Sequence, residues 1–186
     1  MPRVADIVLA LVAVVVLALP MAVVALLVKL TSPGPIFHWS NRIGQDNRLF
    51  AMPKFRSMRI DTPAVATHLL ADGQSWLTPI GGFLRHSSFD ELPQLWCILT
   101  GRMSIVGPRP ALFNQDDLIE ERCRHGVNRL RPGLTGWAQV NGRDRLSITE
   151  KVMLDTQYLE LRSGRLDMKI IWMTIIKVIT GNGVAH

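Results

Sequence analysis

The chain has 186 residues, a length typical of one domain that buries a core without disulfides. Its formal net charge is +6, and sixteen of its 21 basic residues are arginines, whose rigid guanidinium suits phosphate. This excess favours an anionic partner: nucleic acid, an anionic membrane surface or a phosphorylated small molecule. The two cysteines lack metal-binding spacing, which indicates a reduced, cytoplasmic catalytic region and argues against a disulfide scaffold.

Residues 4–28 form an apolar run interrupted only by Asp6 and Pro20, which predicts a membrane segment. The run is too long for the apolar part of a signal peptide, and no small-residue cleavage site follows it. Pro20 lies near the middle of the run and predicts a kink. A kinked helix can cross the bilayer, or it can turn back so that both ends leave by one face. In either case the positive-inside rule places the larger, C-terminal part in the cytoplasm.

After the turn-rich sequence T-S-P-G-P, the chain predicts a compact catalytic region over residues 31–165. The predicted class is α/β, helix-rich, with few short strands. Its elements in chain order are short strands within 36–55, a loop with some helix over 61–78, a helix over 92–100, and polar helices over 116–130 and 147–162. The glycine-rich segment between the last two helices predicts loop and a short strand.

The end of the chain, residues 166–186, differs from the region before it. Residues 166–180 are strongly apolar but carry Lys169 and Lys177, which lie within about 80° of one another on a helix wheel. The segment is too short to span a bilayer, and it suits a helix lying in the membrane interface with its lysines reaching the headgroups. A buried core helix is the alternative that remains open.

The stretch H-S-S-F-D-E-L-P-Q-L-W places Asp90 and Glu91 side by side just before a helix-like apolar run. One interpretation is structural: Ser88 and Glu91 fit a capping box, or Asp90 is itself the N-cap. The other is functional, because neighbouring side chains point in different directions, so that one carboxylate attacks while the other holds a divalent metal. The local pattern leaves both interpretations open.

Basic residues occur near this acidic pair and again in stiff loops. Arg85 precedes the pair, Arg109 lies in V-G-P-R-P, and Arg131 and Arg143 bracket R-P-G-L-T-G-W-A-Q-V-N-G-R. Four arginines held by proline- and glycine-rich loops favour a bound pyrophosphate. Lys54, in M-P-K-F-R-S-M, is a fifth candidate, with a solvated lysine at a strand edge as the alternative.

These motifs, in this order, resemble the bacterial sugar transferases known as monotopic phosphoglycosyl transferases. The resemblance rests on K-F-R-S-M, S-S-F-D-E-L-P-Q-L, M-S-I-V-G-P-R-P, R-P-G-L-T-G-W-A-Q-V-N-G-R, L-D-x-x-Y and L-D-M-K-I, and covers nearly the whole chain. It is closest to the small, single-domain members. In that family the N-terminal segment is a re-entrant helix broken at Ser-Pro; here the proline is kept at Pro20, but Leu19 replaces the serine.

The resemblance implies transfer of a phosphosugar from a UDP-sugar to a polyprenol phosphate, usually undecaprenyl phosphate, with release of UMP. This would be the first membrane-committed step of surface glycan synthesis, at the cytoplasmic face of the bacterial inner membrane. It implies that Asp90 is the nucleophile, forming a covalent phosphosugar intermediate, and that Glu91 ligates Mg²⁺. By the same resemblance Gln139 and Asn141 join Lys54 and the four arginines as substrate-binding residues.

The domain organisation that follows is a re-entrant membrane helix over 1–30 kinked at Pro20, a catalytic region over 31–165 on the cytoplasmic face, and an interfacial helix with its tail over 166–186. The sugar, the glycan pathway, the polyprenol length and the oligomeric state stay open, a homodimer included. Two rivals remain: a non-catalytic membrane interaction protein, in which the acids only cap a helix, and a nucleic-acid-binding membrane protein. The second is disfavoured because only 6% of residues are aromatic, too few for a base-stacking platform.

Overall fold

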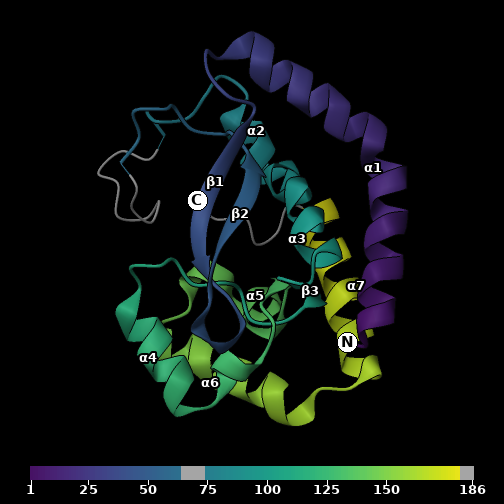
Figure 1. Ribbon diagram of the computed structural model, residues 1–186, viewed down its shortest axis with the longest axis vertical. Helices are drawn as coiled ribbons and strands as arrows, with labels where there is room; N and C mark the ends of the chain where they lie inside the picture. Colours follow the sequence, from purple (N-terminus) through teal and green to yellow (C-terminus); the bar gives the residue numbers. More distant parts are fainter. Residues whose placement is uncertain (64–73, 181–186) are drawn as a thin grey trace.

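The computed structural model describes residues 1–63 and 74–180. Its helices pack around the strands (Figure 1), which pair as two 2-stranded sheets, β1–β2 and β3–β4. The 29-residue helix α1 (Arg3–Thr31) runs along one side of the body. The other elements are β1 (Phe37–Ile43), η1 (Gln45–Asn47), β2 (Leu49–Phe55), α2 (Gly81–His86), η3 (Phe89–Gln94), α3 (Leu95–Leu99), β3 (Ser104–Val106), α4 (Asp116–Arg124), η4 (Val127–Arg129), β4 (Gly133–Thr135), α5 (Trp137–Asn141), η5 (Arg143–Arg145), α6 (Ile148–Leu161) and α7 (Gly164–Thr180).

The helix-rich α/β class with short strands is therefore confirmed. Strands were expected within 36–55 and form there, and α4 and α6 lie within the two predicted polar helices. The helix expected over 92–100 is a 3-10 turn followed by the short α3, because Pro93 has no N–H to donate to the preceding turn. The loop predicted over 61–78 lies largely outside the described residues, as does the tail over 181–186.

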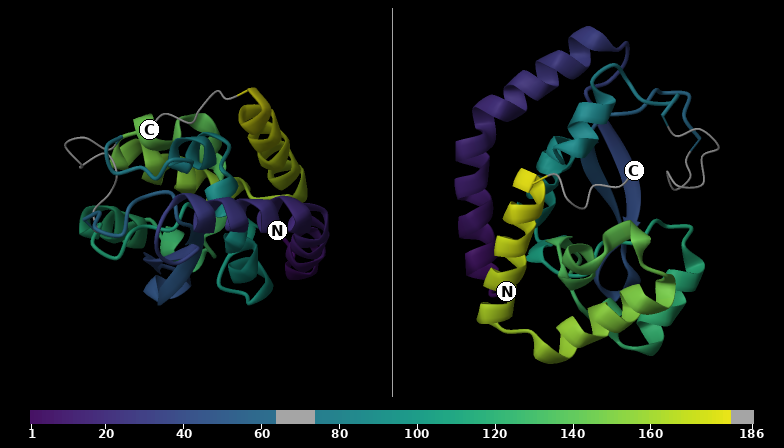
Figure 2. Two further views of the ribbon diagram at one scale, coloured as in Figure 1. Left: turned by 90° about the horizontal axis from the view of Figure 1, so that it is seen from above. Right: turned by 180° about the vertical axis from the view of Figure 1, so that it is seen from behind.

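Helix α1 continues through Pro20 but changes direction midway, so that it curves around the body (Figures 1 and 2). A proline in a helix interior removes one backbone hydrogen bond and crowds the preceding turn, which accounts for a bend. The inner face is buried at Ala10, Val24 and Val28. Most of its other apolar side chains are exposed, and by length and composition α1 is the one described helix that could cross a membrane.

The start of α1 is held to the body by hydrogen bonds that involve two charged residues. At the start, Arg3 donates a hydrogen bond to the carbonyl of Leu99, at 3.0 Å. Asp6 is only 1% exposed and accepts hydrogen bonds from the Ser104 hydroxyl, at 2.8 Å, and from the Ile105 backbone N–H, at 2.9 Å. A buried carboxylate needs such partners, so Asp6 fixes the first turn of α1 onto β3.

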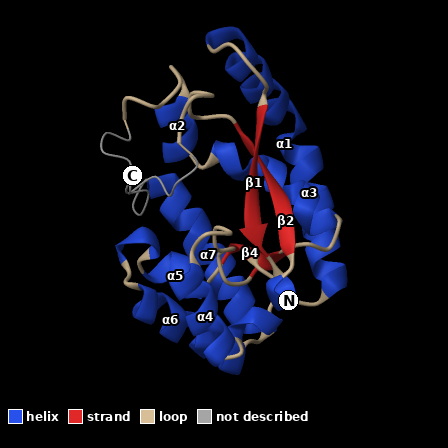
Figure 3. Ribbon diagram, turned by 60° about the vertical axis from the view of Figure 1, so that its left-hand side comes forward, coloured by secondary structure: helices blue, strands red, loops and turns tan. Residues whose placement is uncertain are grey.

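The antiparallel hairpin β1–β2 occupies the centre of the molecule (Figure 3). Its register pairs His38 with Lys54 and Arg42 with Phe50. Because paired residues and alternate positions along a strand share a face, His38, Arg42 and Lys54 all project to one side of the hairpin. The hairpin packs directly beside η3, which carries the acidic pair.

The parallel pair β3–β4 brings two of the sequence motifs together. The Gly107 N–H donates to the Thr135 carbonyl, and the Gly133 N–H donates to the Pro108 carbonyl, both at 2.9 Å. A Cβ on Gly133 would lie 2.1 Å from the Gly107 nitrogen. Glycine is therefore required where V-G-P-R-P crosses R-P-G-L-T-G, since only bare backbones can approach this closely.

Helix α7 lies alongside the first half of α1 (Figure 2). Asp167 and Ile170 are buried against the body, and Lys169 lies over the Trp137 ring at 5.4 Å. The other face exposes large apolar side chains: Met168, Trp172, Ile175, Ile176, Val178 and Ile179. The helix is therefore amphipathic, with one face in the core and one outside, and a wholly buried core helix is ruled out.

Candidate active site

Asp90 and Glu91 lie in the first turn of η3, between α2 and α3. The capping-box interpretation is wrong: Ser88 adopts a left-handed conformation, with φ of 58°, and its side chain makes no capping hydrogen bond. Nor does Asp90 cap the helix, since it lies inside η3. Both carboxylates are buried, at 6% and 8% residue exposure, and both face basic side chains. A capping box does form elsewhere, between Ser147 and Glu150 at the start of α6.

Three of the predicted basic residues converge on one oxygen of Glu91. The ammonium of Lys54 donates to Glu91 Oε1 at 2.9 Å, and Arg109 Nη2 donates to the same atom at 2.8 Å. Arg143 Nη2 lies 3.8 Å from it. Lys54 also contacts Asp90 Oδ2, at 3.5 Å, so it bridges the two carboxylates. The fold therefore brings together residues that lie as far as 89 positions apart in the sequence.

The two carboxylates experience different electrostatic environments. Burial raises the pKa of Asp90 and the neighbouring charge of Glu91 adds to this, while Lys54 opposes both. Burial would also raise the pKa of Glu91, but the charges of Arg109 and Lys54 hold that pKa well below its usual range. Glu91 is thus a permanent anion and Asp90 the more basic carboxylate of the pair. A more basic carboxylate is the better nucleophile once it is ionised.

The remaining predicted residues lie at different distances from this pair. Arg85 donates to the Ser57 hydroxyl at 3.1 Å; burial lowers its pKa, and the charges of Asp90 and Glu91 oppose the shift. Arg85 therefore lies within the electric field of the acids. Gln139 donates to the Leu134 carbonyl and Asn141 to the Trp137 carbonyl, at 3.0 and 2.7 Å. In the described contacts these two amides stabilise the glycine-rich loop and do not touch the acids.

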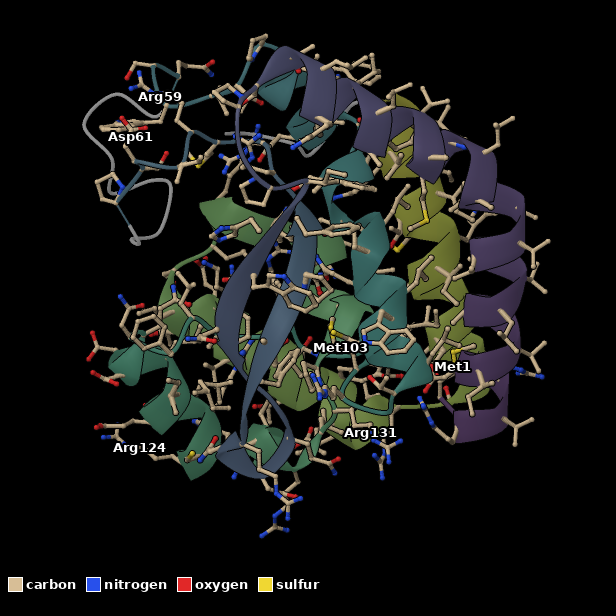
Figure 4. The ribbon with its side chains drawn as sticks, turned by 45° about the horizontal axis from the view of Figure 1, so that its top comes forward. Met1, Arg59, Asp61, Met103, Arg124 and Arg131 are labelled. Carbon is tan, nitrogen blue, oxygen red and sulfur yellow. The ribbon has the colours of Figure 1, made fainter. Side chains whose placement is uncertain are left out.

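Arg131 is not brought to the acidic pair. Its side chain is exposed and extends from the edge of the body (Figure 4), and no contact with Asp90 or Glu91 is found among the described residues. The backbones of the neighbouring Pro132 and Gly133 form hydrogen bonds with Ser104 and Pro108, and Arg131 projects outward from this paired segment. The sequence motif alone placed Arg131 with the other arginines because it carries no information on side-chain direction.

The sequence that carries these acids and cations matches the model of one protein family. The family model described as "Bacterial sugar transferase" matches residues 1–181. The chain belongs to the bacterial sugar transferase family. The predicted resemblance is thereby confirmed at the level of the family.

Several curated bacterial sugar transferases are similar to this chain. The UDP-glucose:undecaprenyl-phosphate glucose-1-phosphate transferase of Escherichia coli (strain K12) is 40% identical over 185 residues, covering 94% of this chain and 39% of the relative. The protein of the same name from Xanthomonas campestris pv. campestris is 39% identical, covering 86% and 34%. The chain thus spans little more than a third of these relatives. The uncharacterized sugar transferase EpsL of Bacillus subtilis (strain 168) is 40% identical, covering 84% of this chain and 76% of EpsL.

Sequence reasoning missed a second group of residues, which supports the backbone that carries Arg109. Arg122 donates to the Arg109 carbonyl at 2.8 Å and to Asp155 Oδ2 at 2.6 Å, and Asp155 is 1% exposed. Arg42 donates to the Pro110 carbonyl at 3.2 Å, and burial together with the charge of Arg109 lowers the pKa of Arg42 to about 10. Both arginines therefore hold the backbone at Arg109 and Pro110 in place.

Two signals in the sequence pointed to these supporting residues. Arg42 lies an even number of positions from His38 on a predicted strand, so a correct hairpin register would have placed both on the same face as Lys54. Asp155 belongs to the L-D-x-x-Y motif that supported the resemblance. No local pattern pairs Asp155 with Arg122, which lies 33 positions earlier.

The two loop arginines should differ sharply when replaced. Arg109→Ala removes a hydrogen bond to a buried charge, and we expect the sugar-phosphate transfer that is proposed below to fall by about tenfold to a hundredfold or more. Arg131→Ala removes an exposed side chain and should change the rate by less than about twofold. Initial rates of UMP release for the two variants provide the comparison. An equal loss for both would show that Arg131 reaches the substrate.

Proposed function

We propose that this protein transfers a sugar 1-phosphate from a UDP-sugar to a polyprenol phosphate, in particular undecaprenyl phosphate, and releases UMP. The product would begin a surface glycan such as an O-antigen, a capsule, an exopolysaccharide or a glycoprotein glycan. The observation that carries the proposal is the Asp90–Glu91 pair, held by Lys54 and Arg109 in a member of this family. The names of the Escherichia coli and Xanthomonas campestris relatives specify UDP-glucose and undecaprenyl phosphate. They support the donor and acceptor classes but do not identify the sugar used here.

In the first step a carboxylate oxygen of Asp90 attacks the β-phosphorus of the UDP-sugar. A new O–P bond forms, the bond from the β-phosphorus to the bridging oxygen breaks, and UMP leaves with that electron pair. The Asp90 side chain keeps 9% of its surface exposed, so one edge can meet the donor. Lys54 contacts Asp90 and opposes the rise that burial causes in the pKa of Asp90. Arg109 and Arg143 lie where they can neutralise phosphate oxygens that gain charge.

In the second step a phosphate oxygen of the polyprenol phosphate attacks the same phosphorus. The bond to Asp90 breaks, the carboxylate is regenerated, and the product is a polyprenol diphosphosugar. The aspartyl phosphate is a mixed anhydride that retains much of the transfer potential of the donor, so this step need not be uphill. No proton has to move in either step, which agrees with a site built from carboxylates and basic side chains.

The residues present fit one Mg²⁺ if the substrate completes its coordination. The hydrogen bonds that Glu91 accepts from described residues all fall on Oε1, which leaves Oε2 for a metal. The described residues contain no cluster of three or more metal-binding side chains, and Mg²⁺ commonly takes one or two carboxylates plus substrate phosphates and water. Glu91 would hold the ion, which when bound supplies charge neutralisation at the diphosphate.

The membrane topology that we propose is re-entrant, with the body at the cytoplasmic face of the inner membrane. Asp6 binds β3 near the first turn of α1, and Arg56 binds Ser32 just after its last turn, so both ends meet one body. A helix that crossed the bilayer would carry its two ends to opposite faces. The bend at Pro20 and the exposed apolar outer face fit entry and return through one leaflet. The apolar face of α7 would lie in the same interface.

The proposed reaction is tested by a burst experiment without lipid acceptor. The protein in nanodiscs is mixed with Mg²⁺ and each member of a UDP-sugar panel, and UMP release and the mass of the peptide containing Asp90 are followed. One equivalent of UMP and a phosphosugar adduct on Asp90 are expected with the true donor. Transfer to undecaprenyl phosphate without a burst would overturn the covalent route, and no UMP under either condition with the whole panel would overturn the function.

Removal of divalent metal should stop the reaction without unfolding the protein. We expect excess EDTA to lower UMP release by at least about a hundredfold, because the diphosphate charge is no longer neutralised. Added Mg²⁺ should restore the rate. Circular dichroism should stay unchanged, since Glu91 keeps Lys54 and Arg109 as partners without metal. A rate that is insensitive to EDTA would exclude the assignment of Mg²⁺ to Glu91.

A further inference from the structure

The last two residues of β2 and the residue that follows contact three different parts of the molecule. Lys54 reaches the acidic pair. Phe55 is 2% exposed and packs in one cluster with Val24 and Val28 of α1. Arg56 turns to the segment that leaves α1. One short stretch of backbone thus joins the active site to the membrane helix.

Arg56 makes an unusually complete set of contacts with that exit segment. Its Nε donates to the Pro35 carbonyl at 2.7 Å, its Nη1 to the Ser32 hydroxyl at 2.7 Å, and its Nη2 to the Ser32 carbonyl at 2.8 Å. The residue is only 4% exposed. All three acceptors are neutral, and no ion pair joins Arg56 to a carboxylate within residues 1–63 and 74–180. A buried cation without a counter-ion is costly unless something compensates it.

The compensation comes from the end of α1. Ser32 is the C-cap of this helix, where the unpaired carbonyls and the helix dipole present partial negative charge. The guanidinium reaches the C-cap carbonyl of Ser32, the Ser32 hydroxyl and the Pro35 carbonyl at once because its donors are fixed in one plane. The backbone adds a further tie, since the Arg56 N–H donates to the Ile36 carbonyl at 2.9 Å. Arg56 therefore locks the end of α1 to the end of β2.

We propose that Arg56 is a positioning residue that sets the height of the Asp90 site relative to the membrane-inserted helix. This inference rests on the proposed two-step reaction and assigns Arg56 a role in its second step alone. The donor is water-soluble and reaches Asp90 by diffusion, whereas the phosphate of the lipid acceptor is held at a fixed depth by its polyprenol chain. Only the second step therefore depends on the distance between the site and α1.

The first step should be insensitive to Arg56 because the site has its own supports. Lys54 is held by strand pairing with His38 and by its contact with Glu91. Arg109 is held by Arg122 through its backbone carbonyl. None of these contacts involves the Arg56 side chain. Loosening the Arg56 contacts should therefore shift the site along the membrane normal while leaving its internal geometry in place.

The test compares Arg56→Gln with Arg59→Gln, a control three residues further on. Arg59 is exposed and pairs with Asp61, so it shares the loop but not the tie to α1. Each variant is assayed in three ways: the UMP burst without acceptor, transfer to undecaprenyl phosphate in the same nanodisc, and transfer in detergent micelles, where the depth of the acceptor is not fixed. Arg56→Lys, which keeps the charge and one donor group, is expected to be intermediate.

We expect Arg56→Gln to keep the burst within about twofold and to lose on the order of tenfold to a hundredfold in nanodisc transfer, since a displacement near 1 Å has that effect. Micelles should restore much of the loss, and Arg59→Gln should behave as wild type. Equal losses in burst and transfer, or no loss at all, would overturn the inference. If the wild type gives no burst, the covalent reaction fails, yet the nanodisc and micelle rates of Arg56→Gln still decide the role of Arg56.

Discussion

Replacing Asp90 by asparagine should abolish both the phosphosugar adduct and the transfer reaction, with a loss of at least about 10³-fold. The amide has nearly the same shape as the carboxylate but cannot form the acyl phosphate. Lys54 retains Glu91 as its closer partner, at 2.9 Å against 3.5 Å to Asp90, so we expect the site to keep its structure. Mass spectrometry of the Asp90 peptide and UMP release measure the two losses.

A matched control is Asp117→Asn, which removes an exposed carboxylate from the first turn of α4. Its transfer rate should stay within about twofold of wild type, because isolated surface changes have small effects. An Asp90→Asn protein that still transferred sugar phosphate at a tenth of the wild-type rate would exclude Asp90 as the nucleophile. Glu91 would then be the carboxylate to examine for an adduct.

Replacing Asp155 by asparagine should destabilise the protein by about 3 kcal/mol and also slow transfer. The mutation leaves the partly buried Arg122 without its anionic partner, and breaking a buried ion pair from one side typically costs about 3–5 kcal/mol. Burial raises the pKa of Asp155 despite the attraction of Arg122, so the intact pair itself adds little net stability. Transfer should slow because Arg122 also holds the carbonyl of Arg109. Thermal unfolding in detergent and UMP release are the two measurements.

The exposed pair of Glu120 and Arg124 supplies the comparison for Asp155. Glu120→Gln should change stability by less than about 1 kcal/mol, because exposed ion pairs on a helix contribute little. Replacing Asp155 and Arg122 together by apolar residues should restore part of the stability lost in Asp155→Asn, but not the transfer rate. A double variant with full activity would show that Arg122 does not position Arg109.

The local features of this protein were readable from its sequence. The apolar run of residues 4–28 predicts a helix, because a single segment in lipid can satisfy its backbone hydrogen-bonding groups only within a helix. The strands within 36–55 and the helices α4 and α6 follow from residue periodicity and turn residues over short windows. The motifs around Asp90 and Arg109 identified the family, which the match over residues 1–181 confirms. The helices and strands depend on residues close together in the chain, and the family follows from the order of short motifs along it.

Tertiary structure alone decided which charged residues meet. Ser88 and Glu91 have the spacing of a capping box, yet Glu91 turns to Lys54 and Arg109 because two nearby cations stabilise a buried carboxylate more than one backbone N–H does. Arg109 and Arg131 lie in equally stiff loops, and backbone pairing of the second loop turns Arg131 outward. The roles of Arg42, Arg56 and Asp155 depend on contacts between segments that are distant in the sequence. A local sequence pattern cannot predict such contacts, because they form only when those segments pack together.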